Sequence, residues 1–473
     1  MRFELDRVGS IRFSDHFELV SSHPLGMVKV RFGTENTRSN QKSPPGLFFN
    51  WDSGLFPLAR RSLVRPVYSD APKNSKEMVS IAVPTKDQVA QLELCLASIR
   101  RCHPECELIV VDDGSHQAIA VAEIAIKHRA TLIRRSPGGG PASARNIALA
   151  NSRREYVLFV DSDVILAPPT LDRLLCWFQI PEVMAAGPRV LAGGNGYDPG
   201  PMQRAFHARF GLDMGRSNFT VDDFDPGQPK SSRYFPSAVL LVKRQAVMEL
   251  GGFDEGLRYA EDVDLLWRIA QAKGLSVYDP RAWAYHLIEP KPTKQMVKSF
   301  QYGRSNSPLA KRHAERMSAF STSDQTAMAV GMMPFLSPSG LVAALLFPAI
   351  RFAAHSHHGF SSRLTRKASL AILAQTAAGV EDLYSRTYLA PIIALSLFHK
   401  GMRRTLLWLL VIRVLMLATS QGTGSILLFD LMASLANDIA YSLGAWEKAI
   451  SDQKFTWLRF RLTAFSSNRH GHS

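Results

Sequence analysis

Apolar and polar positions alternate in a regular order between residues 78 and 163. Short β-branched runs are separated by stretches in which apolar residues recur every three or four positions. The runs predict strands at 78–85, 107–115, 131–135 and 156–163, and the intervening stretches predict helices at 91–101, 118–128 and 142–152. This alternation indicates a doubly wound parallel α/β sheet. Ligands of such sheets bind beyond the carboxyl ends of the strands, where the polar residues of this chain gather.

The sequence on either side has a different pattern. The first 76 residues mix short alternating runs with Gly, Pro and Ser, which predicts a β-rich or extended segment. From about residue 295 the chain becomes helical and apolar. The predicted parts are a small N-terminal segment at 1–76, an α/β domain at 77–300 and a mostly α-helical region at 301–473.

Two apolar stretches in this last region bear on membranes. Residues 325–350 contain no charged residue and are long enough to span a bilayer, although three prolines interrupt them. The stretch 405–420 carries Arg413 at its centre, which is costly in lipid. Basic residues between the two stretches suit a membrane-facing loop. We therefore expect membrane association, with a buried soluble helical domain as the alternative.

Composition limits the classes of partner. Lys and Arg number 56 against 41 Asp and Glu, a net charge of +15 that favours anionic partners. The basic residues are dispersed and lack an interleaved aromatic platform, so no nucleic acid is expected. None of the four cysteines forms a C-x-x-C pair. The first residues contain no apolar signal-peptide region, so we expect the α/β domain on the cytoplasmic side of the cell membrane.

An acidic pair closes the fourth predicted strand. Asp161 and Asp163 lie two positions apart, so both carboxylates can face one hard cation. Mg²⁺ or Mn²⁺ held there would bridge a substrate diphosphate. An Asp-x-Asp sequence alone is more often a surface loop, but its place at the end of a buried strand favours the metal site.

Further polar pairs follow other predicted strands. Asp112 and Asp113 end the second strand and can accept hydrogen bonds from a base or ribose; the alternative is a plain strand-to-helix turn. Arg145 and Asn146 lie in the helix after a Gly-rich loop, where they suit phosphate or the metal site; a structural salt bridge is the equal alternative.

A second acidic pair precedes the apolar helix at 263–269. Asp262 or Glu261 beside a sugar would take the proton from an attacking hydroxyl, which would invert the anomeric configuration. The alternative is an acidic first helical turn. His286 follows a strand-like stretch and would complete a metal shell, although a lone histidine is more often structural. The chain contains neither a complete G-x-G-x-x-G nor a P-loop motif, which disfavours dehydrogenases and P-loop enzymes.

Together these pieces resemble the family 2 glycosyltransferases. The resemblance rests, in the family's order, on VSIAVPT, VVDDGS, PASARN, FVDSD, GGFDE, AEDVDLLWR and the Tyr285-His286 pair. It implies a GT-A, Rossmann-like fold. The donor-binding residues that it implies are Pro84, Asp112, Asp113, Arg145, Asn146, Asp161 and Asp163. It further implies a metal held by Asp161, Asp163 and His286, and Asp262 as the catalytic base with Glu261 beside it.

A closer resemblance, to the mycofactocin-system glycosyltransferases, extends into the C-terminal region through FQYGRSNSPLAKRH and LANDIAYSLGAWEKAI. It implies transfer of glucose from UDP-glucose to a peptide-derived redox cofactor or its precursor. That family shows Gly where this chain has Ala260, which keeps the turn unless a positive φ is required.

The expected protein is thus an inverting, metal-dependent glycosyltransferase at the membrane surface. A transferase of the same fold that builds cell-envelope glycolipid or polysaccharide, on a lipid-linked acceptor, is the alternative. A protein that kept the fold but lost turnover is the non-enzymatic rival, and the intact acids Asp161, Asp163, Glu261 and Asp262 argue against it.

Overall fold

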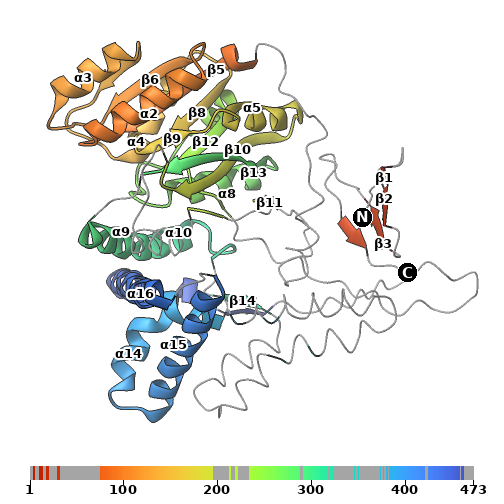
Figure 1. Ribbon diagram of the computed structural model, residues 1–473, viewed down its shortest axis with the longest axis vertical. Coiled ribbons are helices and arrows are strands. Elements are labelled where there is room, and N and C mark those ends of the chain that lie inside the picture. Colours follow the sequence, from red (N-terminus) through yellow and green to blue (C-terminus); the bar gives the residue numbers. More distant parts are fainter. Residues whose placement is uncertain are drawn as a thin grey trace, which may run out of the picture. The chain divides into compact units, whose positions relative to one another are not determined.

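A computed structural model of the chain contains two compact units (Figure 1). The larger unit comprises 68–318 and 417–458, and the smaller comprises 1–67, 319–416 and 459–473. The structure describes residues 4–5, 10–13, 17–20, 29–31, 75–194, 212–214, 219–221, 234–287, 291–317, 320–322, 346, 350, 373, 377, 380–381, 383–420, 424–458 and 460–462.

The larger unit is built on a nine-stranded sheet whose first half is parallel. Its strands are β5 (Val79–Thr85), β6 (Glu107–Asp112), β7 (Thr131–Arg134) and β8 (Tyr156–Val160). β5 pairs in parallel with both β6 and β8, and β6 pairs in parallel with β7. β5, β6 and β8 are almost continuously apolar and buried, as strands covered on both faces must be. The four strands predicted from the apolar runs are therefore confirmed.

The second half of the sheet is mixed. It contains β9 (Val164–Leu166), β10 (Val183–Ala192), β11 (Phe219–Thr220), β12 (Val239–Lys243) and β13 (Leu275–His286). β12 runs antiparallel between β8 and β10, whereas β10 and β13 are parallel. The fully parallel sheet expected from the sequence thus ends at β8, because the next strand beside it, β12, runs in the opposite direction.

Helices connect the strands and supply the core. They are α2 (Val89–Cys102), α3 (Ala118–Lys127), α4 (Pro141–Asn151), α5 (Thr170–Leu175), α7 (Arg244–Glu249) and α8 (Glu261–Gln271), with short helices η1 (Ser75–Met78) and η2 (Cys176–Gln179). α4 packs on β5 and β6 through a small-residue face that includes Ala144 and Ala148. Phe159 of β8 meets Phe253 edge-on at 5.2 Å between ring centroids, which joins the sheet to the loop before α8.

Three further helices complete the larger unit: α9 (Pro292–Arg304), α10 (Asn306–Arg312) and α16 (Gly424–Asp452). α9 and α16 cross at two glycines. A Cβ on Gly303 would lie 2.0 Å from the Tyr441 carbonyl oxygen, and one on Gly444 would lie 2.0 Å from that of Phe300. The predicted division at residue 300 separates segments that this close packing holds in one unit.

The smaller unit contains strands and helices from both ends of its sequence. Its strands are β1 (Glu4–Leu5), β2 (Ser10–Phe13), β3 (Phe17–Val20) and β4 (Lys29–Arg31) in one antiparallel sheet, and β14 (Phe320–Thr322) paired with β15 (Phe460–Leu462). Its helices are η4 (Leu383–Tyr388), α14 (Leu389–Ser396) and α15 (Lys400–Ser420) up to residue 416. The short helix η5 (Thr456–Leu458) belongs to the larger unit.

Arg413, which the sequence places in an apolar stretch, is buried within the smaller unit. Its Nε donates to Glu381 Oε1 at 2.7 Å, beside a cluster formed by Val380, Leu409 and Ile412. The charge is therefore paired within protein. Among the described residues, no helix combines the length and the apolar character needed to cross a bilayer. The predicted span at 325–350 lies outside the described residues except for two single positions.

Candidate active site

The acids predicted to bind a nucleotide and a metal follow neighbouring strands. Asp161 and Asp163 come directly after β8, and Asp113 comes directly after β6. β5 lies between these two strands and is parallel to both, so their carboxyl ends meet at one edge of the sheet. The register therefore brings together residues that lie about fifty positions apart in the chain.

Asp113 organises the Gly-rich loop before α4. Its two carboxylate oxygens accept hydrogen bonds from the backbone N–H groups of Gly139 at 2.6 Å and Gly140 at 2.9 Å. A Cβ on Gly138 would lie 2.1 Å from the Asp113 carbonyl oxygen, so only glycine fits there. Each carboxylate oxygen has a second lone pair, which leaves Asp113 able to accept from a nucleotide while it fixes the loop.

Two other predicted donor-binding residues have structural contacts. Asp112 is fully buried, accepts from the Ser115 N–H at 2.8 Å and forms an ion pair with Arg134. Pro84 lies within β5, opposite Val111 of β6. Asp112 therefore closes the turn after β6, which positions Asp113 beside it.

Arg145 connects the two acidic pairs predicted from the sequence. Its guanidinium lies 2.7 Å from Asp161 Oδ1 and 2.6 Å from Glu261 Oε1, and its charge stands 5.5 Å from the Phe253 ring centroid. Arg145 and Glu261 are buried, whereas the Asp161 side chain is 31% exposed. One buried cation thus holds the end of β8 against the start of α8, and its partner Glu261 lies 116 residues after Arg145 in the chain.

Burial raises the pKa of Glu261 to about 7, against the lowering effect of Arg145. Its neighbour Asp262 adds to the rise because it places a second negative charge nearby. Glu261 is therefore partly protonated at neutral pH and bound to Arg145, which suits a residue that positions its neighbours.

Asp262 is held by the backbone. Its Oδ2 accepts from the Ser237 N–H at 3.0 Å and its Oδ1 from the Val263 N–H at 2.8 Å, and the side chain stays partly exposed. Ala260 immediately before the pair has φ 63°, ψ 24°, a left-handed conformation. The turn does require a positive φ, so the alanine at this position is strained where glycine would not be.

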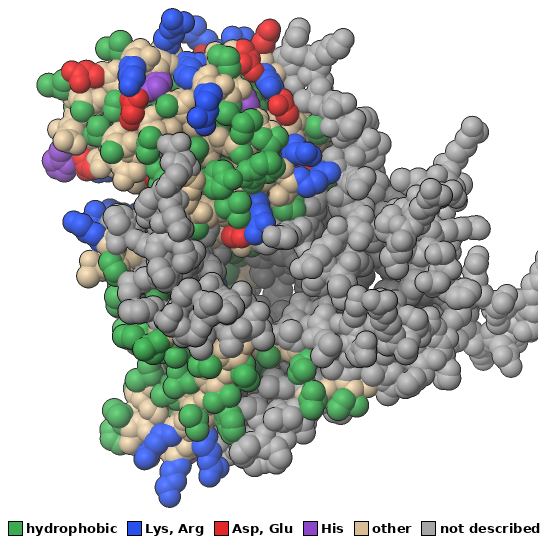
Figure 2. All heavy atoms as spheres, viewed as in Figure 1, with side chains coloured by type: hydrophobic (Ala, Val, Ile, Leu, Met, Phe, Trp, Pro, Cys, Tyr) green, Lys and Arg blue, Asp and Glu red, His purple; other side chains and the backbone are tan. Residues whose placement is uncertain are grey.

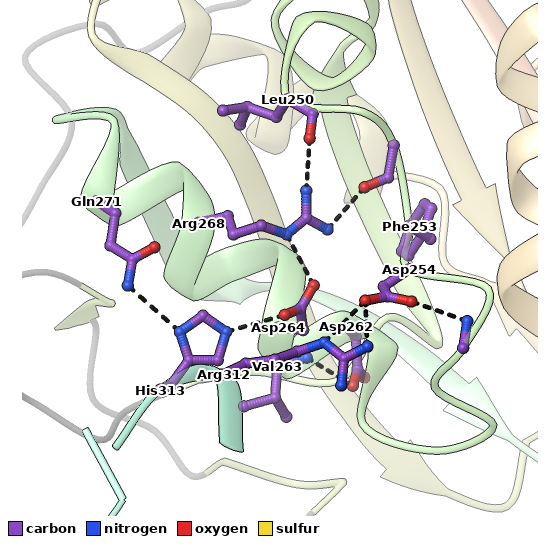
Figure 3. A network of polar contacts seen from close by, with 12 residues as sticks. Leu250, Phe253, Asp254, Asp262, Val263, Asp264, Arg268, Gln271, Arg312 and His313 are labelled. Carbon is purple, nitrogen blue, oxygen red and sulfur yellow. Dashed lines mark hydrogen bonds and ion pairs between the residues drawn. The ribbon is translucent and has the colours of Figure 1, made fainter. Parts of the chain in front are cut away.

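A buried polar network fixes α8 behind these acids (Figure 3). Arg268 donates to Asp264 Oδ2 at 2.7 Å and to the carbonyl oxygens of Leu250 and Gly252 at 2.8 and 2.7 Å. His313 of the segment after α10 lies 2.9 Å from Asp264 Oδ1. Burial alone would raise the pKa of Asp264, but the bonds to His313 and Arg268 hold it below the ordinary value. Asp264 therefore remains a charged anchor for the helix.

Asn146 does not join the carboxylates. Its amide nitrogen donates to the Phe253 carbonyl at 2.8 Å and to Glu255 Oε1 at 3.0 Å, and its oxygen accepts from the Phe253 N–H. Asn146 thus secures the loop before α8 and makes no hydrogen bond to Asp161, Asp163 or Glu261 among the described contacts.

His286 and Asp163 meet because β13 ends beside β9. The Leu287 N–H donates to the Asp163 carbonyl at 2.8 Å, and His286 Nε2 lies 3.5 Å from Asp163 Oδ2. Gln88 Nε2 donates to the same Asp163 oxygen at 3.3 Å. Burial lowers the pKa of His286 against the effect of Asp163, so the ring is neutral at pH 7, the form that binds metals.

These groups fit a divalent cation in chemistry and in spacing. Two ligand atoms at about 2.1 Å from one ion stand roughly 3.0–3.5 Å apart, which matches the separation of His286 Nε2 and Asp163 Oδ2. Asp161 is the third predicted ligand, and one of its oxygens is engaged by Arg145. Within the described residues, no three His, Cys, Asp or Glu side chains already converge on one point.

Two residues of α9 belong to the site and were not predicted. Lys298 Nζ lies 5.8 Å from the Tyr302 ring centroid, and the Tyr302 ring meets Tyr259 edge-on at 5.6 Å. The pKa of Lys298 is raised, chiefly by Tyr302 and also by Asp163 and Asp161, so the ammonium stays charged beside the acids. The i, i+4 spacing of Lys298 and Tyr302 was the only signal in the sequence, and it does not say which face of α9 meets the site.

The arrangement defines a class of protein. Residues 80–243 match the model of the family described as Glycosyl transferase family 2. Residues 80–243 are therefore similar to the family 2 glycosyltransferases, which confirms the resemblance inferred from the motifs. They lie on a GT-A-like mixed α/β sheet, and a helical C-terminal region follows.

Among relatives, the chain is similar to the pre-mycofactocin glycosyltransferase of Mycobacterium tuberculosis, with 31% identity over 270 residues, 57% of this chain and 55% of the relative. It is also 31% identical, over 144 residues, to the N-acetylglucosaminyl-diphospho-decaprenol L-rhamnosyltransferase of the same species, covering 28% of this chain and 47% of the relative. The chain thus spans about half the length of these curated relatives.

A solved mannosyltransferase from Pyrobaculum calidifontis, in complex with GDP-Man and Mn²⁺, aligns over 82% of this chain and 89% of its own, with a TM-score of 0.43 and 16% identity.

Proposed function

We propose that the protein is a metal-dependent, inverting glycosyltransferase that moves glucose from UDP-glucose to the peptide-derived redox cofactor mycofactocin or its precursor. One observation carries the reaction type. Buried Arg145 forms ion pairs with both Asp161, a predicted metal ligand, and Glu261, the neighbour of the predicted base, so it holds the two groups of acids together. The choice of acceptor is supported by the C-terminal sequence resemblance and by the pre-mycofactocin relative, whereas the choice of donor rests on the sequence resemblance alone.

The chemistry is a single displacement. The acceptor oxygen attacks the anomeric carbon while its proton passes to Asp262, and the bond from that carbon to the diphosphate breaks with its electron pair on the diphosphate oxygen. The two backbone N–H groups that bind Asp262 orient its carboxylate, and free lone pairs remain to take the proton. One base on one face gives inversion.

The leaving diphosphate belongs at the end of β8. A divalent cation bound by Asp163, His286 and Asp161 would neutralise the charge that develops on the leaving oxygen. Lys298 supplies a fixed positive charge beside the same acids, and Asp113 with its glycine loop lies on the neighbouring strand for the nucleoside.

The first test follows release of nucleoside diphosphate from a panel of nucleotide sugars, with Mn²⁺ or Mg²⁺ and with EDTA. We expect UDP-glucose to be turned over, and Asp163→Asn and Asp262→Asn to lose at least a hundredfold in rate. Asp172→Asn, at a partly exposed acid of α5 that is paired with Lys76, is the matched control and should keep full activity. Equal rates in Asp262→Asn and Asp172→Asn would refute the assigned base.

A second function is favoured by the rhamnosyltransferase relative: transfer to a lipid-linked diphosphate acceptor of the cell envelope. The same panel, supplied in turn with a mycofactocin-type acceptor and a polyprenyl-diphosphate sugar, separates the two. In either case we place the activity at the cytoplasmic face of the cell membrane, which the basic and apolar C-terminal sequence supports.

A further inference from the structure

Apolar side chains are exposed at the turn between α14 and α15. Leu397 is 71% exposed and Phe398 is 85% exposed, with Leu395 beside them at the end of α14. Side chains this large are seldom presented to water together unless they contact something. Figure 2 shows hydrophobic side chains gathered over this part of the molecule, with Lys and Arg side chains at its end.

The basic residues follow immediately in the chain. Lys400, Arg403 and Arg404 are all exposed in the first turns of α15. The sequence from residue 383 to residue 429 contains no Asp or Glu, so no acid within this stretch offsets them. We name this surface the basic-apolar tip; its members are Leu395, Leu397, Phe398, Lys400, Arg403 and Arg404.

The apolar surface continues along α15. Leu407, Val411 and Leu415 are exposed and spaced four residues apart, so they form a stripe along one side of the helix. The opposite side is buried: Leu409 and Ile412 pack in the core of the smaller unit, and Arg413 pairs with Glu381. The helix therefore turns its central charge inward and an apolar stripe outward, the reverse of an ordinary surface helix.

We propose that the basic-apolar tip and the α15 stripe dock the protein on the surface of an anionic lipid bilayer, with the apolar side chains inserted among the headgroups and the three basic side chains on the lipid phosphates. An amphipathic surface of this composition binds through buried apolar area and through attraction to anionic lipid. Basic residues near such a surface are attracted by its anionic headgroups.

A second copy of the chain is a poorer occupant of this surface. A two-fold contact over the tip would bring Lys400, Arg403 and Arg404 of both copies together, and residues 383–429 offer no acid to separate the like charges. An anionic bilayer satisfies the same charges and covers the apolar side chains at once. The inference rests on the membrane location proposed above, for which it names the contact surface, and its test measures binding alone and does not depend on the proposed reaction.

The test measures co-sedimentation of the full chain with vesicles of phosphatidylcholine alone or with about one-third phosphatidylglycerol. We expect binding to the anionic vesicles and at least a tenfold weaker association with the neutral ones, with a marked loss at 1 M salt. Leu397→Ser/Phe398→Ser and Arg403→Gln/Arg404→Gln should each reduce binding to anionic vesicles at least fivefold.

The matched control is Ile119→Ser/Ile126→Ser on α3, whose side chains are 77% and 76% exposed but lie beside Glu123 and Lys127 rather than a basic cluster. It should bind like the unaltered chain. All altered positions are exposed, and circular dichroism and thermal midpoints confirm that the variants fold. Undiminished binding by both tip variants would overturn the proposal. So would failure of the unaltered chain to bind, or a dimer in sedimentation velocity that only the tip variants dissociate.

Discussion

At the scale of single residues, burial decides whether the acids of this site are charged. Glu261 and Arg145 form an ion pair in the interior, yet the cost of burying the carboxylate exceeds the attraction, and the pKa of Glu261 rises to about 7. A carboxylate on an exposed first helical turn would behave in the opposite way. The backbone conformation of Ala260 and the raised pKa of Lys298 are likewise set by the surrounding structure.

The raised pKa of Glu261 predicts a dependence of stability on pH. The folded protein holds a proton on this residue between pH 4.5 and about 7, whereas the unfolded chain releases it. The contribution of Glu261 to the free energy of unfolding is therefore fully present below pH 4.5. It is lost as the pH rises to 7, and the loss amounts to up to about 3 kcal/mol. Urea unfolding at pH 5 and pH 7.5 should show this loss, and Glu261→Gln should lack that component of it. An identical pH dependence in the variant would contradict the raised pKa.

The left-handed conformation of Ala260 predicts a stabilising substitution. Ala260→Gly relieves a backbone that L-residues adopt at a cost, so we expect the free energy of unfolding to rise by about 0.5–1 kcal/mol. Ala272→Gly at the other end of α8, where φ is −78°, is the control and should not stabilise. The thermal midpoints of the unaltered chain and the two variants test this. A midpoint of Ala260→Gly no higher than that of the unaltered chain would show that residue 260 is not strained.

Lys298 predicts a loss of turnover without a loss of fold. Lys298→Met removes the positive charge beside Asp161 and Asp163, where the proposed reaction gathers negative charge on the leaving group. We expect the rate of nucleoside diphosphate release to fall about a hundredfold, with the thermal midpoint little changed. Lys294→Met, an exposed lysine one turn earlier on α9, should keep the normal rate. Equal rates would remove Lys298 from the site.

At the scale of elements, the site depends on α9 being held in place by α16. Their backbones approach at Gly303 and Gly444, and Ser299 Oγ donates to Asn437 Oδ1 at 2.7 Å along the same interface. α9 carries Lys298 and Tyr302 to the acids, so a helix that begins 120 residues after α9 ends sets the position of two site residues.

Gly444→Val tests this contact. Its Cβ would fall about 2.0 Å from the Phe300 carbonyl oxygen, a backbone atom that cannot move without shifting α9. We expect the free energy of unfolding to fall by about 1–3 kcal/mol. We also expect the rate of nucleoside diphosphate release to fall under conditions in which the variant is still folded. Leu443→Ala, at the exposed neighbouring position, serves as the reference. A Gly444→Val protein with normal stability would show that the helices do not cross so closely.

At the scale of the whole molecule, the larger unit is discontinuous in sequence. It closes only when 417–458 joins 68–318, although 98 residues of the smaller unit intervene as 319–416. Trp457 and Ala449 pack with Ala310 in one buried cluster, so the C-terminal segment completes the core.

Truncation tests this organisation. A chain that ends at residue 318 exposes the face of α9 that meets α16, and we expect it to aggregate or to lose its cooperative thermal transition. A chain in which 68–318 is joined to 417–458 through a Gly/Ser linker should regain that transition. If the chain ending at 318 folds as stably as the full protein, the packing of α16 is dispensable.

The local pattern of apolar and polar residues is enough to predict the first four strands of the sheet and the acids at their ends. Apolar β-branched runs specify β5, β6, β7 and β8, because strands buried on both faces leave an uninterrupted signal. The acids after β6 and β8 were placed correctly at the strand ends, since parallel strands share one edge. The family assignment rested on the same motifs. These features are local, and a short window of sequence contains their cause.

Tertiary structure decided the rest because it depends on contacts between distant segments. The antiparallel pairing of β12 with β8 joins residues about 80 positions apart. The pairing of Arg145 with Glu261 and the contact of His286 with Asp163 join residues more than 100 positions apart. Asn146 binds the loop at Phe253 rather than the carboxylates, and this contact too joins distant parts of the chain. Charge and burial of a side chain are properties of its neighbours, and no periodicity in the chain records which neighbours those are.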